Sequence, residues 1–125
     1  PYTTLFRSTT FEYRNIEVAG TTTTDSKLIV SVEIENTGDR AGSEVVQVYL
    51  ARKDSSVKRP PLWLAGFEKV TVEAGAVERV TVEVDPRRFA HYDGGWKFES
   101  GEFEVYAAKS AELADALHST VNLLK

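Results

Sequence analysis

The residues that could do acid or base chemistry in this chain are its nineteen carboxylates. General acid/base catalysis by carboxylates needs two of them facing each other across a fixed distance. Seven of them instead fall on positions that alternation assigns to the outward face of a strand, where a solvated sheet face is the expected role. These positions are Glu33, Glu35, Glu68, Glu73, Glu83, Glu102 and Glu104. The pattern therefore predicts no catalytic carboxylate pair.

Other reactive groups are few and scattered. The two histidines, His91 and His118, are far apart in the sequence, and there is no cysteine. No G-x-S-x-G elbow and no glycine-rich phosphate loop is present. We therefore predict no catalytic residue, no metal site and no cofactor.

Aromatic side chains are the remaining candidates, because sugar rings stack on flat apolar faces. Trp96 and Tyr106 fall near a turn or on an outward position, which makes them candidate carbohydrate contacts. Phe89 and Tyr92 are expected to close one end of the fold in the manner of a corner tyrosine.

Composition narrows the classes of partner. A chain of 125 residues forms one domain, and its net charge of −4 comes with acids and bases interspersed. Without a basic stripe a nucleic acid is a poor partner, and no apolar run approaches the length of a membrane span. Neither observation fixes a cellular compartment.

Alternating patterns predict an all-β chain of about seven or eight strands. Leu28, Val30, Val32 and Ile34 share one face of a strand over 27–36, which a turn joins in a hairpin-like corner to a second strand over 44–52. The expected order begins with a strand at Phe11–Val18 and a polar turn over 21–26, and it continues with strands over 64–73 and 77–85 around a hairpin loop. Strands over 97–98, 102–109 and 119–124 follow, and in the strand over 102–109 the side chains of Phe103, Val105 and Ala107 are expected to point inward. Short strands at this spacing are typical of a β-sandwich.

Five motifs occur in an order that resembles a known family. They are Thr9-Thr10-Phe11-Glu12-Tyr13, the run from Asn36 to Leu50, Arg59-Pro60 with Leu64-Ala65-Gly66-Phe67-Glu68-Lys69-Val70, Val80 to Asp93, and Gly101 to Ser110. Together they resemble the fibronectin type III-like domain that ends many family 3 glycoside hydrolases of the β-glucosidase and β-xylosidase type. Trp63 and Ala107-Ala108 depart from the family pattern.

The resemblance implies an immunoglobulin-like β-sandwich over residues 9–125. It also implies a non-catalytic accessory domain that packs on the catalytic domains of the same polypeptide, which lie outside this chain. The alternative is an independent module that binds an oligo- or polysaccharide or a protein. A packing domain is expected to show an apolar patch around 59–67, whereas a sugar-binding module is expected to show coplanar exposed rings.

The candidate contact with other domains is the segment of Arg59, Pro60, Pro61 and Trp63. It joins two strands, so its backbone is expected at the surface, yet it is rich in apolar side chains. Arg and Trp are also enriched at interface hot spots. The alternative is that Trp63 folds back and caps the sandwich.

Residues 1–8 resemble the translation of a sequencing adapter. We expect these residues to be a non-native leader that belongs to no fold.

Overall fold

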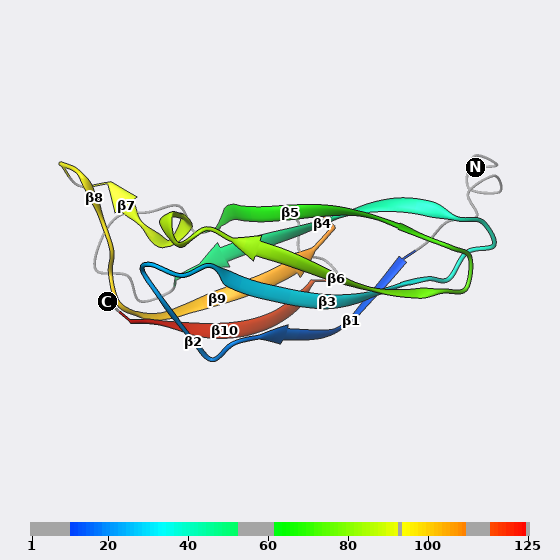
Figure 1. The fold of residues 1–125 in the computed structure, drawn as a ribbon, viewed down its shortest axis with the longest axis horizontal. Helices are drawn as coiled ribbons and strands as arrows, with labels where there is room; N and C mark the ends of the chain where they lie inside the picture. Colours follow the sequence, from blue (N-terminus) through cyan, green and yellow to red (C-terminus); the bar gives the residue numbers. More distant parts are fainter. Residues whose placement is uncertain (1–10, 53–61, 93, 110–115, 125) are drawn as a thin grey trace.

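The computed structural model describes residues 11–52, 62–92, 94–109 and 116–124, and it is a β-sandwich (Figure 1). A three-stranded sheet has the order β1-β3-β6, and a five-stranded sheet has the order β2-β10-β9-β4-β5. A short pair, β7-β8, projects beyond one end of the sandwich (Figure 1). The strands are β1 (Phe11–Val18), β2 (Thr21–Thr23), β3 (Leu28–Asn36), β4 (Gly42–Ala51), β5 (Trp63–Val72), β6 (Val77–Val84), β7 (His91–Tyr92), β8 (Trp96–Lys97), β9 (Gly101–Ala108) and β10 (Leu117–Leu124).

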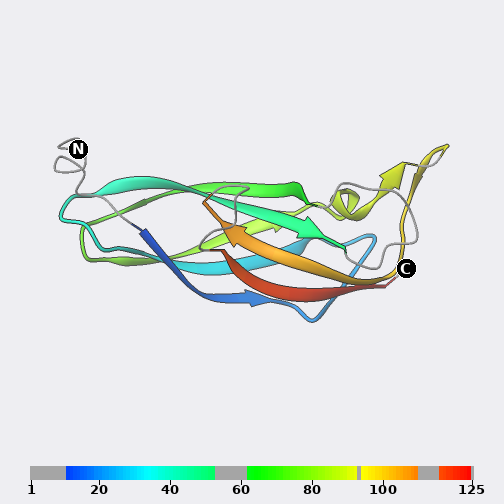
Figure 2. The same ribbon diagram turned by 180° about the vertical axis from the view of Figure 1, so that it is seen from behind.

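The predicted strand faces account for the core. Leu28, Val30, Val32 and Ile34 of β3 are buried, as the alternation predicts. From the facing sheet β9 contributes three side chains that were also expected to point inward, and all three are fully buried: Phe103, Val105 and Ala107. The two sheets therefore stack with their apolar faces together, and β9 and β10 run side by side in Figure 2.

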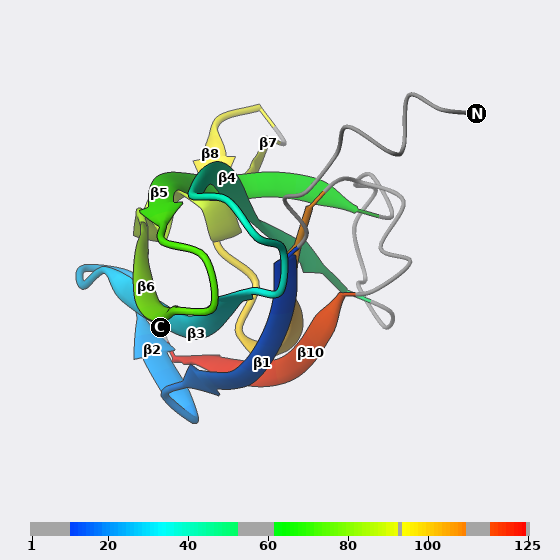
Figure 3. The same cartoon turned by 90° about the vertical axis from the view of Figure 1, so that its right-hand side faces the viewer.

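Two connections expected as hairpins instead pass between the sheets. Strands β3 and β4 belong to different sheets, and so do β5 and β6. The end-on view in Figure 3 shows β5 and β6 where one sheet gives way to the other. An alternating strand fits either partner sheet, because it offers one apolar face to the same core. The hairpin expectation was therefore wrong at both places.

Asn36 joins the two crossing connections at one end of the sandwich. Its buried side-chain amide donates to the backbone carbonyls of Arg40, at 2.7 Å, and Val72, at 2.9 Å. Its side-chain oxygen accepts from the backbone N–H of Gly38 at 2.9 Å, which is the local bond expected of an Asx turn. These hydrogen bonds offset the cost of removing the amide from water, and they link the two corners.

The sheet edges contain more strands than the sequence pattern predicts. The segment expected as a polar turn begins with β2, which pairs in parallel with β10 through Thr21, Thr22 and Thr23. The last strand also starts two residues before its expected position, at Leu117. The predicted leader of residues 1–8, and Arg59, Pro60 and Pro61, lie outside the described residues.

A part-buried polar contact bridges the two sheets. The Tyr13 hydroxyl on β1 donates to Oε2 of Glu44 on β4 at 3.1 Å. Burial, and then the nearby Glu44 carboxylate, raise the pKa of Tyr13 far above its ordinary value. Tyr13 therefore stays protonated and acts as the donor in the folded protein.

Candidate interaction surfaces

The outer face of the five-stranded sheet carries an apolar patch at its β4–β5 edge. Phe67 is 65% exposed and Leu64 is 44% exposed. In the ladder Phe67 lies opposite Gln47 and Leu64 lies opposite Tyr49, so both point away from the core. Val45 shares this outward face two residues before Gln47. We call Val45, Leu64 and Phe67 the β4–β5 patch.

Tyr106, a candidate carbohydrate contact, lies on the same face further into the sheet. Its ring centroid is 4.9 Å from that of His118, with 32° between the ring planes. Its hydroxyl lies 3.4 Å from Oε1 of Glu104, and Nε2 of His118 lies 3.7 Å from Oε2 of the same carboxylate. Glu104 points outward as expected, but its side chain is only 14% exposed. Tyr106 is therefore held within a cluster of the sheet surface.

Trp63, the described member of the predicted contact segment, is half-buried at the end of the sandwich. Its indole N–H donates to the carbonyl of Arg88 at 2.7 Å, and its ring packs edge-on against Phe103. The sequence left open whether Trp63 caps the sandwich or contacts another domain. Its ring packs on the core as a cap would, and part of its surface is still exposed for a contact.

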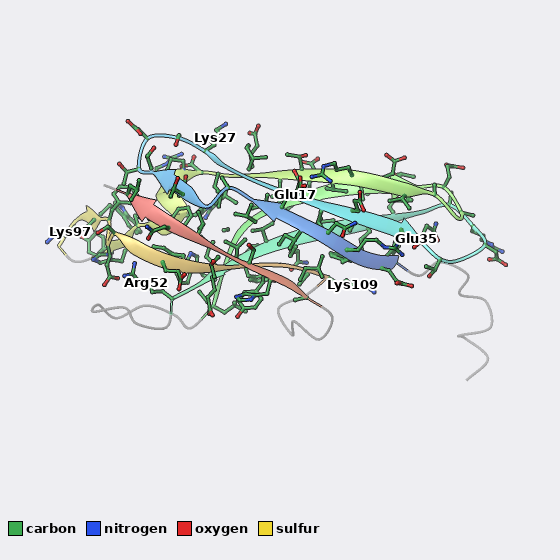
Figure 4. All side chains as sticks on the ribbon, turned by 90° about the horizontal axis from the view of Figure 1, so that it is seen from below. Glu17, Lys27, Glu35, Arg52, Lys97 and Lys109 are labelled. Atoms are coloured by element: carbon green, nitrogen blue, oxygen red, sulfur yellow. The ribbon has the colours of Figure 1, made fainter. Side chains whose placement is uncertain are left out.

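Phe103 is the centre of this end of the sandwich. The ring of Phe89 packs edge-on against that of Phe103, with 4.9 Å between the ring centroids. The Arg52 guanidinium carbon lies 4.8 Å from the centroid of the Phe103 ring. Arg52 also donates to the carbonyls of Glu99 and Ser100, which places it at the start of β9 (Figure 4). Phe89, on a single 3-10 turn (Pro86–Phe89), is fully buried and closes the sandwich as expected.

Tyr92 does not close the sandwich, which corrects the expectation for this residue. The preceding residue, His91, is buried, and strand alternation therefore turns Tyr92 outward to 67% exposure. Trp96, across the β7-β8 ladder, is 73% exposed. The two rings meet edge-to-face, with centroids 5.4 Å apart and 77° between their planes. The projecting hairpin therefore carries an exposed aromatic pair.

A groove lies between this hairpin and the 3-10 turn. Its lining residues are Asp85, Arg87, Arg88, Ala90, Trp96 and Phe98, which we call the hairpin groove. Asp85 caps the 3-10 turn by accepting from the backbone N–H of Arg87 at 2.9 Å. Its two oxygens also receive the Arg87 guanidinium, at 3.2 and 3.0 Å. These bonds lower the pKa of Asp85 to about 2.

The outer face of the three-stranded sheet is ionic. Arg14 pairs with Glu35, Arg79 pairs with Glu17, and Lys27 pairs with Glu83 at 3.3 Å. Glu17 on β1 and Glu35 on β3 are labelled in Figure 4. Of these carboxylates, Glu35 and Glu83 were predicted to lie on an outward sheet face, and they do.

The described residues form neither a metal-binding cluster nor a membrane-spanning helix. No group of three or more His, Cys, Asp or Glu side chains there could hold a metal ion. The described part of the chain also has no helix that is long and apolar enough to cross a bilayer.

Several known proteins that are similar to this chain are β-glucosidases. A thermostable β-glucosidase B from Acetivibrio thermocellus is 42% identical over 107 residues, which are 82% of this chain and 14% of that protein. A β-glucosidase from Kluyveromyces marxianus is 40% identical over 83% of this chain and 12% of its own length. The chain thus spans about one-seventh of the curated relatives that it matches.

Solved structures of β-glucosidases contain a region with the same fold as this chain. A β-glucosidase from Erythrobacter marinus superposes with a TM-score of 0.83 at 33% identity, over 93% of this chain and 16% of that one. A GH3 β-glucosidase from Bifidobacterium adolescentis superposes with a TM-score of 0.80, over 92% of this chain and 17% of that one. The family model of the fibronectin type III-like domain matches residues 44–111. The chain therefore belongs to the fibronectin type III-like domain family.

Proposed function

We propose that this chain is a non-catalytic accessory domain of a family 3 glycoside hydrolase of the β-glucosidase type, and that it packs on and stabilises the catalytic domains of the same polypeptide. One observation carries the proposal: 82% of the chain aligns with a β-glucosidase at 42% identity, yet covers only 14% of it. Such a match is expected for one module of a larger enzyme.

The β4–β5 patch supports packing against another domain. Phe67 and Leu64 are large apolar side chains that a solvated sheet face does not need. They follow Trp63 on β5 by four residues and by one residue, within the region where an apolar patch was expected. We therefore propose this patch, with Trp63, as the contact with the catalytic domains, and Arg59, Pro60 and Pro61 stay predicted members of it.

The alternative function, an independent sugar-binding module, predicts coplanar exposed rings. The exposed pair Tyr92 and Trp96 is closer to perpendicular, at 77°. This pair does not offer the flat platform of two rings that an independent sugar-binding module needs, so the accessory role is favoured over that module.

A chimera tests the proposal. In the Acetivibrio thermocellus β-glucosidase, the segment that matches this chain is replaced by residues 9–124 or deleted. We expect the chimera to retain β-glucosidase activity and most of its melting temperature, and the deletion variant to lose both. A chimera that behaves like the deletion variant would overturn the proposal.

A matched pair of variants locates the contact in the chimera. Leu64→Ser removes an apolar side chain that is 44% exposed in the proposed contact. Ile29→Ser removes one that is 43% exposed on the outer face of the three-stranded sheet. We expect Leu64→Ser to lower the chimera's melting temperature more than Ile29→Ser does. Equal effects would remove the patch from the proposal.

The chain itself is expected to be inactive. It should release no chromophore from chromogenic β-glucosides or β-xylosides at high protein concentration and several pH values. Turnover that survives repurification and disappears when one of the chain's own carboxylates is replaced would contradict the accessory role.

A further inference from the structure

The hairpin groove combines an aromatic wall with fixed polar groups, and none of its residues belongs to the β4–β5 patch. We propose that the hairpin groove binds one neutral pyranose ring of an oligosaccharide, with Trp96 as the stacking surface and the Asp85–Arg87 pair as the hydrogen-bonding group. The inference does not depend on where the domain docks.

The aromatic side of the groove suits a sugar ring. Trp96 is 73% exposed and lines the groove together with Phe98. The edge-to-face contact with Tyr92 restricts the orientation of the Trp96 ring. The C–H bonds on one face of a pyranose carry weakly positive hydrogens, which are attracted to the negative face of an indole. One such ring can hold one sugar without a coplanar neighbour.

The polar side of the groove is an ion pair that forms without a ligand. Asp85 is held by the backbone N–H and by the guanidinium of Arg87. Arg87 remains exposed, and its Nη1 makes no hydrogen bond to the residues that the structure describes. A guanidinium presents donors in a planar fork, and a carboxylate has acceptor sites beyond those used here. Adjacent sugar hydroxyls both donate and accept, so they match this pair.

The charge balance of the groove favours a neutral ligand over an anion. The ion pair with Asp85 offsets the charge of Arg87. Arg88 is then the one cation of the groove without a salt bridge to a described residue. One exposed cation on a chain of net charge −4 is a weak attraction for an anion.

Nuclear magnetic resonance of the intact chain provides the test, since its two tryptophans report on two different places. We expect titration with cellobiose, laminaribiose or xylobiose to shift the indole N–H signal of Trp96 more than that of Trp63, whose N–H bonds to the carbonyl of the groove residue Arg88. Saturation is expected in the millimolar range, which is typical of a small contact, so titration to about 10 mM suffices. Parallel titrations with sodium sulfate and with glucuronate test whether the groove binds an anion instead.

Variants separate the groove from the β4–β5 patch. Trp96→Ala should weaken oligosaccharide binding, measured by calorimetry, by about tenfold, while Phe67→Ala, which removes another exposed aromatic ring, should leave it unchanged. Should Trp96→Ala fail to fold, Arg87→Gln takes its place, because the Arg87 side chain is 85% exposed.

Three results would overturn the inference. The first is the absence of a Trp96 shift with all three disaccharides, and the second is a shift with the anions alone. The third is equal weakening by Trp96→Ala and Phe67→Ala. None of these results bears on the chimera, so this inference and the proposed function fail separately.

Discussion

The outer faces of the two sheets differ although both follow the same alternation. On the three-stranded sheet the outward residues form cross-strand ion pairs, among them Arg14 with Glu35 and Arg79 with Glu17. On the five-stranded sheet the outward residues include the exposed Phe67 and Leu64. The first face is covered by ion pairs and carries only separate apolar side chains, Ile29 and Val77, whereas the second has neighbouring apolar side chains that only another surface would cover. The difference indicates which side of the sandwich is available for a partner.

The largest expected effect tests whether Trp63 stabilises the domain's own fold or serves only as contact surface. Trp63→Ala removes a half-buried ring that packs on Phe103 and an N–H bond to the Arg88 carbonyl. We expect it to lower the free energy of unfolding by about 3 kcal/mol, the low end of the range for a buried Trp. Urea denaturation of the isolated chain measures this value.

Trp63→Phe serves as the control, because it keeps much of the ring packing and removes the N–H donor. A change below about 0.5 kcal/mol for Trp63→Ala would instead identify Trp63 as pure contact surface.

The second-largest effect tests the hydrogen bond that links the two sheets. Tyr13→Phe removes the hydroxyl that donates to Glu44 across the sandwich. We expect a loss of about 1 kcal/mol, the usual contribution of one hydrogen bond. Thermal denaturation at neutral pH measures it, and Glu44→Gln, which keeps an acceptor, is the comparison. A stabilised Tyr13→Phe variant would contradict this role.

The same contact predicts a loss of stability at alkaline pH. The pKa of Tyr13 is raised in the folded state from an ordinary value of 10.0. The stabilisation is therefore fully present below pH 10 and is lost progressively as the pH rises above it. The wild-type protein should lose more stability between pH 9 and 11 than Tyr13→Phe does. Parallel curves for the two proteins would rule out this linkage.

A smaller effect is expected on the ionic face. Arg79→Ala removes exposed ion pairs with Glu17 and Glu33. Exposed pairs contribute little, and we expect a loss of about 0.5 kcal/mol at low salt that shrinks as salt is added. Denaturation at two salt concentrations measures it. A salt-independent loss would show that Arg79 acts through packing rather than charge.

The smallest effect is expected at the β4–β5 patch. Phe67→Ser should change the free energy of unfolding of the isolated chain by less than about 0.5 kcal/mol, because its side chain is largely exposed already. The variant should also be more soluble than the wild-type chain. A large destabilisation would mean that the patch serves the domain's own fold, and the contrast between the two faces would then lose its functional meaning.

The sequence by itself determined which residues form the core. Period-two alternation places Val30 and Val32 on one side of a strand and Ser31 and Glu33 on the other, whatever the partner strand is. The same rule predicted the inward side chains of β9, such as Phe103. Ordered motifs further identified the fibronectin type III-like family, which the comparisons confirm.

Only the tertiary structure decided how the strands are distributed between the sheets and which aromatic rings are exposed. The turn after Asn36 suits a hairpin or a crossing equally, and the crossing is fixed by a bond to the Val72 carbonyl, thirty-six residues away. The half-burial of Trp63 depends on Arg88 and Phe103 in the same way. Local patterns fix the face of a strand, whereas contacts between distant segments fix its neighbours, because any strand with one apolar face can pair at several places around the same core.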